Sequence, residues 1–101
     1  MSFSIRFVDE VEEDIFSAYL WYEKQSSGLG ETFLSEIYSK LDPQRFFPRM
    51  YQLVFLDFRR ILSGRFPYAI YYRIRGDFVV VYGVFHTRKD PAEIIKSMLG
   101  R

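Results

Sequence analysis

The sequence predicts an α+β protein in which two antiparallel helices pack on one face of a twisted, mostly antiparallel sheet. Three observations indicate this class: an N-terminal segment that alternates apolar and polar residues, two consecutive segments with helical spacing, and a β-rich hairpin around a Gly-Asp pair. Each of these elements must bury its apolar face against another element, so they form layers. The length of 101 residues suits one domain, residues 1–101.

The N-terminal half reads as one strand and two helices. Residues 2–8 alternate apolar and polar side chains with the period of a strand. Apolar residues at helical spacing between Val11 and Tyr22 predict a helix over about 9–25. The Ser-Ser-Gly-Leu-Gly segment at 26–30 ends that helix, and a second one follows over about 31–41. So short a connection makes the two helices an antiparallel hairpin.

The C-terminal half reads as three strands and a short helix. A turn or a short 3₁₀ segment is expected within 44–53, followed by strands over 54–62, 68–74 and 78–85. With the N-terminal strand, they make a four-stranded sheet. A terminal helix begins at Pro91, where Asp90 is placed to cap its N-terminus.

The hairpin around Gly76-Asp77 sets the faces of the sheet, because both residues tolerate the positive φ of a tight turn. A two-residue turn pairs Arg75 with Phe78, Tyr71 with Tyr82 and Pro67 with His86. Alternation then divides the side chains into two sets. One face, assigned to the helices, carries Tyr68, Ile70, Tyr72, Ile74, Val79, Val81, Gly83 and Phe85. The opposite face carries Tyr71, Arg73, Arg75, Tyr82, His86 and Arg88 among a few apolar residues, and it is the candidate site.

Charge is divided unevenly along the chain. Residues 1–42 contain three Lys or Arg and nine acids, a net charge of −6, whereas residues 43–101 contain eleven Lys or Arg and four acids, a net charge of +7. The basic half suits phosphates or an acidic protein partner. The alternative is that the two halves neutralise each other where they pack. There is no cysteine, no secretory signal and no apolar run of membrane-spanning length, so a cytoplasmic protein without disulfides is expected.

The basic half contains the residues best suited to catalysis or to binding a charged partner. His86 is the single histidine, and its pKa range suits acid–base work or phosphate contact. Arg60, Arg73 and Arg88 are candidates to clamp a phosphate, since Arg binds phosphate through two hydrogen bonds, and Tyr71 and Tyr82 are candidates to stack on bases. The ordinary alternatives are solvated arginines, cross-strand packing of the tyrosines and a hydrogen-bonded histidine. The 20 % aromatic content is mainly core filling. No cluster of residues has metal-ligand spacing, and no cofactor is expected.

Several motifs, taken together and in order, resemble the RelE/ParE toxin superfamily, and most closely its ParE-like, plasmid-stabilisation branch. They are Trp21-Tyr22-Glu23 with Gly28-Leu29-Gly30 and Phe33, then Asp42-Pro43-x-Arg45-Phe46, Arg59-Arg60, Arg65-Phe66-Pro67-Tyr68-x-Ile70-x-Tyr72-Arg73, and Val84-x-His86-x-Arg88-x-Asp90-Pro91. The resemblance covers nearly the whole chain. It implies a two-helix hairpin on a twisted sheet and a toxin silenced by a cognate antitoxin, often through an acidic helical segment. The basic half suits such a partner.

The resemblance leaves the cellular target open. ParE-like members are associated with inhibition of DNA gyrase, and under that reading the chain is a protein-binding inhibitor whose contacts are Arg60, Arg65, Tyr71, Arg73, Tyr82, His86, Arg88 and Lys89. RelE-like members are ribosome-dependent mRNA endoribonucleases. Under that alternative His86 is the acid or base, and Arg60 and Arg73 stabilise the phosphorane charge. The sequence has no Tyr after His86, which favours the ParE-like reading. A further alternative is a decayed, non-toxic member. Without its antitoxin, the chain is also a candidate homodimer.

Overall fold

A computed structural model describes residues 2–101. Its elements follow one another as β1 (Ser4–Phe7), α1 (Asp9–Gln25), α2 (Leu29–Leu41), a 3₁₀ turn η1 (Asp42–Arg45), β2 (Leu53–Phe55), β3 (Phe58–Leu62), β4 (Tyr68–Arg75), β5 (Phe78–His86) and α3 (Pro91–Leu99). The five strands are ordered β1-β5-β4-β3-β2. β1 runs parallel to β5, and all other neighbours are antiparallel.

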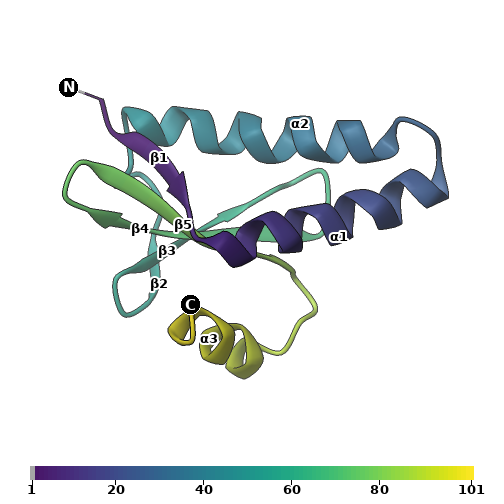
Figure 1. Ribbon diagram of the computed structural model, residues 1–101. Coiled ribbons are helices and arrows are strands. Elements are labelled where there is room, and N and C mark those ends of the chain that lie inside the picture. The colour runs from purple at the N-terminus through teal and green to yellow at the C-terminus, as the bar shows by residue number, and fades with distance from the viewer. Residues whose placement is uncertain (1) are drawn as a thin grey trace.

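The sheet is covered on both faces (Figure 1). The α1–α2 hairpin lies along one face, where α1, α2 and the inward side chains of β3, β4 and β5 form the larger core. The short helix α3 lies on the other face, and its Ile94 and Met98 pack with Phe58, Tyr71 and Phe85 in a second, smaller core. The predicted α+β class and the two-helix hairpin are therefore confirmed.

The terminal helix begins as the sequence predicts. The Asp90 carboxylate accepts a hydrogen bond from the backbone N–H of Ala92 at 3.1 Å, and Pro91 occupies the first helical turn, where its missing N–H costs nothing.

The prediction of four strands was wrong, because the segment 54–62 is two strands. β2 and β3 form a tight hairpin in which Phe55 pairs with Phe58 across Leu56 and Asp57. Leu56 takes a positive φ of 47°, which leucine rarely adopts. No glycine or asparagine stands at that position to signal a turn, so the sequence favoured one continuous strand. The second helix also begins two residues earlier than predicted, at Leu29.

The predicted hairpin register holds only near the turn. Arg75 pairs with Phe78 and Tyr72 with Val81, but Tyr71 pairs with Gly83 because Tyr82 is an extra residue in β5. This β-bulge reverses the side-chain faces beyond it. Val84 therefore joins the larger core and Phe85 the smaller one, the opposite of the sequence assignment. His86 pairs with Tyr68, and not with Pro67.

Gly83 makes the bulge possible. A Cβ atom at this position would lie 2.2 Å from the ring of Phe85, a distance that real contacts do not reach. The missing side chain lets the Phe85 ring fold back over the bulge and onto the face covered by α3. A glycine inside a strand often marks such a close approach.

Candidate functional site

Two of the predicted site residues, Arg73 of β4 and Tyr82 of β5, lie in a packed network on the α3 face. The Arg73 guanidinium lies over the rings of Tyr82 and Phe58, with its Cζ 4.4 Å and 4.7 Å from the ring centroids. Its Nη2 donates a hydrogen bond to the Tyr82 hydroxyl at 3.0 Å, and its Nη1 donates to Asp57 at 3.4 Å. The Arg73 side chain therefore serves first to hold Asp57, Phe58 and Tyr82 together on this face.

Asp57, in the β2–β3 turn, joins this network to the end of the hairpin. Its carboxylate accepts hydrogen bonds from both Arg73 and Arg75. Partial burial alone would raise the pKa of Asp57, but the hydrogen bond and charge of Arg75, with the charge of Arg73, outweigh it and lower that pKa. The carboxylate is therefore ionised at neutral pH, and its one negative charge offsets one of the two positive charges of Arg73 and Arg75.

The two candidate stacking residues differ in exposure. Tyr71 is 8 % exposed, and its ring packs against Phe85 with a centroid distance of 6.0 Å. Tyr82 is half-buried, with its ring edge-to-face with Phe58 and the Arg73 guanidinium in contact with both rings. The buried Tyr71 ring therefore presents no free face of the kind that base stacking requires.

His86 lies apart from Arg73. His86 is paired with Tyr68 and Arg73 with Val80, so the two positions are five residues apart along β4, about 17 Å at the usual strand rise. The bulge also turns His86 towards the side of α1, where its ring meets Tyr68 edge-on at 5.2 Å. His86 Nδ1 accepts a hydrogen bond from the Arg88 N–H at 3.0 Å. A cavity of about 540 Å³ beside it is also lined by Glu10, Glu13 and Asp14 of α1.

The remaining predicted contacts are exposed but dispersed. Arg60 lies opposite Tyr71 on the α3 face of β3. Arg65, in the β3–β4 connection, lies near α2 and lines a shallow cavity with Glu31 and Glu36. Arg88 and Lys89 follow β5, and Lys89 Nζ lies 5.1 Å from the Phe85 ring centroid. The structure thus brings Arg73 and Tyr82 together and distributes the other basic residues over separate regions of the surface.

The sequence analysis missed an ion pair between Asp14 and Arg101, which lie 87 positions apart. Arg101 donates from Nη1 to Asp14 Oδ2 at 2.7 Å and from Nη2 to Oδ1 at 3.0 Å, and both side chains are less than 15 % exposed. The pair also completes the β-bulge: Asp14 accepts from the Val84 N–H at 3.1 Å, and the Tyr82 carbonyl accepts from Arg101 at 2.9 Å. No local pattern in the sequence indicates such a contact.

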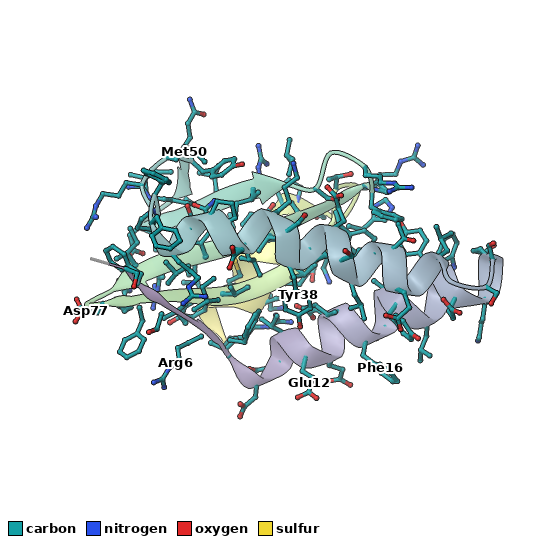
Figure 2. All side chains as sticks on the ribbon, turned by 90° about the horizontal axis from the view of Figure 1, so that it is seen from above. Arg6, Glu12, Phe16, Tyr38, Met50 and Asp77 are labelled. Carbon is teal, nitrogen blue, oxygen red and sulfur yellow. The ribbon has the colours of Figure 1, made fainter. Side chains whose placement is uncertain are left out.

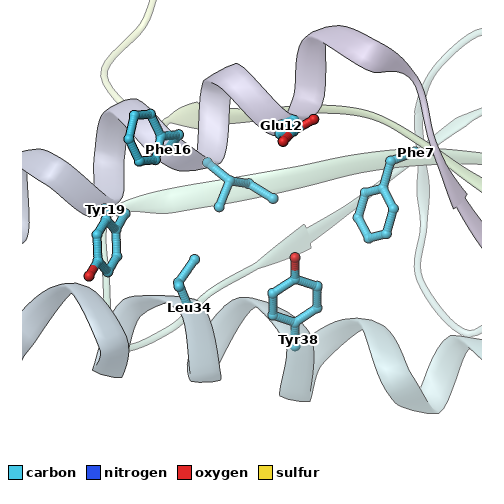
Figure 3. Close-up of a pocket in the computed structure, with 7 residues that line it drawn as sticks. Phe7, Glu12, Phe16, Tyr19, Leu34 and Tyr38 are labelled. Atoms are coloured by element: carbon cyan, nitrogen blue, oxygen red, sulfur yellow. The ribbon is translucent and has the colours of Figure 1, made fainter.

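An apolar groove runs along the outer side of the helical hairpin (Figure 3). Its volume is about 490 Å³, and it is lined by Phe7, Glu12, Ile15, Phe16, Tyr19, Leu34 and Tyr38. Phe16 and Tyr38 are 57 % and 50 % exposed. In Figure 3 the rings of Phe7, Phe16, Tyr19 and Tyr38 surround the opening between α1 and α2, with Glu12 at the α1 side. A groove between two helices, lined by apolar rings, suits the apolar face of a third helix.

Residues 2–101 lack two further features. No group of three His, Asp or Glu side chains in this range is placed to hold a metal ion. None of the helices described combines the length and the apolar character needed to cross a membrane.

The two-helix hairpin packed on one face of a twisted sheet is the architecture that the resemblance implied for RelE/ParE-type toxins. The family model described as the ParE toxin of the type II toxin–antitoxin system parDE matches residues 5–91, and the chain belongs to this family. The predicted ParE-like branch of the superfamily is confirmed.

A solved structure has the same fold. It is described as the chromosomal ParDE toxin–antitoxin system from P. aeruginosa, and it is 14 % identical to this chain with a TM-score of 0.71. The alignment covers 84 % of this chain and 96 % of the other. A search of curated proteins finds no significant match.

Proposed function

We propose that this toxin acts by binding a protein target, DNA gyrase, and that a cognate antitoxin binds it and keeps it inactive. The family match over residues 5–91 carries the proposal, and the similarity to a ParDE structure supports the antitoxin partner. The gyrase target is the finer part of the proposal and rests on the family alone.

The arrangement of the basic residues supports protein binding over RNA cleavage. A nuclease needs its acid–base group and its charge stabilisers around one phosphate, within a few ångströms of each other. Here the backbone positions of His86 and Arg73 are about 17 Å apart along β4 by strand rise, and the intervening bulge directs them to different faces. Arg73 is further held by Asp57 and Tyr82.

The antitoxin contact is proposed to be the groove between α1 and α2. Its apolar lining is exposed and concave, so a helix seated there would bury the rings of Phe16 and Tyr38. The groove belongs to the acidic half of the chain and has Glu12 at its edge. We therefore expect the antitoxin residues in the groove to be apolar with a basic residue near Glu12, and any acidic antitoxin segment to lie elsewhere.

Induction of the chain in a bacterial host tests the target. Growth, transcript ends by primer extension and plasmid supercoiling are followed together, and purified toxin is then added to gyrase. Growth arrest with intact transcripts and inhibited supercoiling is the expected result. Arrest with cuts at defined codon positions would instead establish the mRNA endonuclease, with His86 as the first residue to substitute. No arrest at all would identify a decayed toxin.

A matched pair of α1 variants tests the antitoxin site. Phe16 and Trp21 are both 57 % exposed on the same helix, but only Phe16 lines the groove. Phe16→Glu is expected to keep growth arrest and to lose neutralisation by the antitoxin encoded beside the gene. Trp21→Glu should remain neutralised. Equal neutralisation of both variants would move the antitoxin site away from the groove.

A further inference from the structure

The apolar groove between α1 and α2 continues past the helices towards the edge of the sheet. In Figure 3 Phe7 and Tyr38 lie together at one end of the groove, and their rings meet edge-to-face with centroids 6.2 Å apart. Beyond this pair is a second hollow of about 410 Å³, which Phe7 and Tyr38 also line. Its other lining residues are Ser4, Ile5, Leu41, Asp42 and Arg45. A segment that leaves the groove at its Phe7 end therefore passes along β1.

β1 is an outermost strand of the sheet, with β5 on one side and no strand of residues 2–101 on the other. The Ser4 N–H donates to the Asp77 carbonyl at 3.0 Å, and the Val8 N–H donates to the Val81 carbonyl at 3.1 Å. These even-numbered positions of β1 therefore direct their backbone groups to the β5 side. Because backbone groups alternate along a strand, the odd-numbered positions direct their N–H and C=O groups to the free edge.

Two of these outward positions have no strand beside them. The Phe3 N–H donates to the Arg45 carbonyl at 2.7 Å, so the 3₁₀ turn η1 covers the edge at Phe3. Ile5 and Phe7 follow beyond that cover. Backbone N–H and C=O groups at a free sheet edge accept an added strand. Because Ile5 and Phe7 also line the second hollow, these free backbone groups lie where the groove continues.

Arg6, between the two outward positions, disfavours a second copy of the chain as the added strand. Two copies of β1 that pair antiparallel through both Ile5 and Phe7 place Arg6 opposite Arg6. Like charges directly opposite each other destabilise a strand pair.

The surroundings of Arg6 favour an acidic residue opposite it. Its guanidinium stacks on Phe78, with Cζ 4.4 Å from the ring centroid, and it forms no ion pair with any acid of residues 2–101. Figure 2 shows the Arg6 side chain directed outward from β1, away from α2. A strand from another protein with an acidic residue at this position would supply the opposite charge.

We propose that the antitoxin continues from the helix in the groove into a short extended segment, which adds to the sheet beside β1 and places an acidic residue opposite Arg6. This inference rests on the proposed function, because it extends the antitoxin site in the groove. A chain leaving the groove reaches Phe7 before Ile5. A helix followed by a strand therefore runs antiparallel to β1, which is the slightly more stable pairing. The acidic antitoxin residue expected outside the groove thereby has a defined position.

Amide hydrogen exchange tests the added strand. It is followed residue by residue by NMR in the free toxin and in its purified complex with the antitoxin encoded beside the gene. The Ile5 and Phe7 amides are expected to exchange about tenfold more slowly in the complex or slower still, because they gain hydrogen-bond acceptors. The Ser4 and Val8 amides are the matched controls, since they are already bonded on the β5 side and should change less. Cross-strand NOEs between the antitoxin and β1 should accompany this protection.

Charge variants at Arg6 test the acidic residue. The dissociation constant of the complex is expected to rise about threefold for Arg6→Gln, which loses an exposed ion pair, and about tenfold for Arg6→Glu, which adds repulsion. Lys24→Glu makes the same charge change at an exposed position in the last turn of α1 and should bind as wild type does. Wild-type affinity of Arg6→Glu would overturn the acidic residue.

Phe16→Glu separates this inference from the proposed function beneath it. Normal antitoxin binding by Phe16→Glu would overturn the groove site itself, as would a wild-type toxin that the antitoxin does not bind. Binding that is lost in Phe16→Glu, combined with unchanged exchange of the Ile5 and Phe7 amides in the wild-type complex, would overturn the added strand alone.

Discussion

Replacing Asp14 with alanine should destabilise the protein severely, because it leaves the largely buried Arg101 charged and without its acidic partner. The change removes two charge-assisted hydrogen bonds from Arg101 and the acceptor of the Val84 N–H. The Tyr82 carbonyl and the Phe85 ring remain as neutral partners of the Arg101 guanidinium. Both side chains are less than 15 % exposed, so solvent screens the pair weakly. Breaking a buried pair from one side costs about 3–5 kcal/mol. We expect about 3 kcal/mol, a large part of the 5–15 kcal/mol that folds a typical domain.

Urea unfolding, followed by Trp21 fluorescence and circular dichroism, measures this cost as a change in midpoint at constant m-value. Thermal melting should fall by roughly 12–24 °C, at about 4–8 °C per kcal/mol for a domain of this size. The double variant Asp14→Ala/Arg101→Ala should lose less than the sum of the single variants, with a coupling energy of about 2 kcal/mol. Asp57→Ala is the control, since its partner Arg75 is half exposed, and it should cost about 1 kcal/mol or less. An Asp14→Ala cost as small as that control would refute the reasoning.

Two further predictions concern the tyrosine and the glycine that hold the sheet in shape. Burial raises the pKa of Tyr72 to about 12, so this residue contributes stability that is complete below pH 10 and is lost as the pH rises towards 12. Alkaline titration of unfolding should show that loss, and Tyr72→Phe should remove it; an unchanged alkaline profile in the variant would assign the loss to other groups. Gly83→Ala should cost about 1–3 kcal/mol in the free energy of unfolding, because its Cβ would meet the Phe85 ring at 2.2 Å. Gly76→Ala in the β4–β5 turn provides the comparison, since nothing lies within 4 Å of a Cβ there and its cost comes from φ alone.

Local patterns accounted for most elements of the fold. The helical spacing in 9–25, the Gly-Asp turn and the Asp90-Pro91 helix start each depend on neighbours within a few residues, and each was predicted correctly. The β2–β3 turn was missed because Leu56 carries no turn signal and adopts its positive φ only within the folded hairpin. The bulge at Tyr82 was missed for a related reason, since alternation along the strand continues through it and only Gly83 interrupts the pattern.

The candidate site depended more heavily on tertiary contacts. Composition identified the basic half and its residues, but it could not tell which arginines are already paired. Asp57 occupies Arg73 and Arg75, and the bulge turns His86 away from both. The exposed apolar surfaces could not be predicted either, because nothing in the sequence distinguishes the exposed Phe16 and Phe47 from the buried phenylalanines.

The sequence by itself determined the α+β class, the helical hairpin, the central turn and the family, since each rests on spacing or motif order that survives without coordinates. The tertiary structure alone decided three features: which face each strand residue occupies beyond the bulge, which charges are neutralised, and which apolar side chains remain in solvent. The physical reason is the distance along the chain over which each interaction acts. Backbone propensity acts over a few residues, whereas the Asp14–Arg101 pair joins positions 87 residues apart and exists only after the chain has folded.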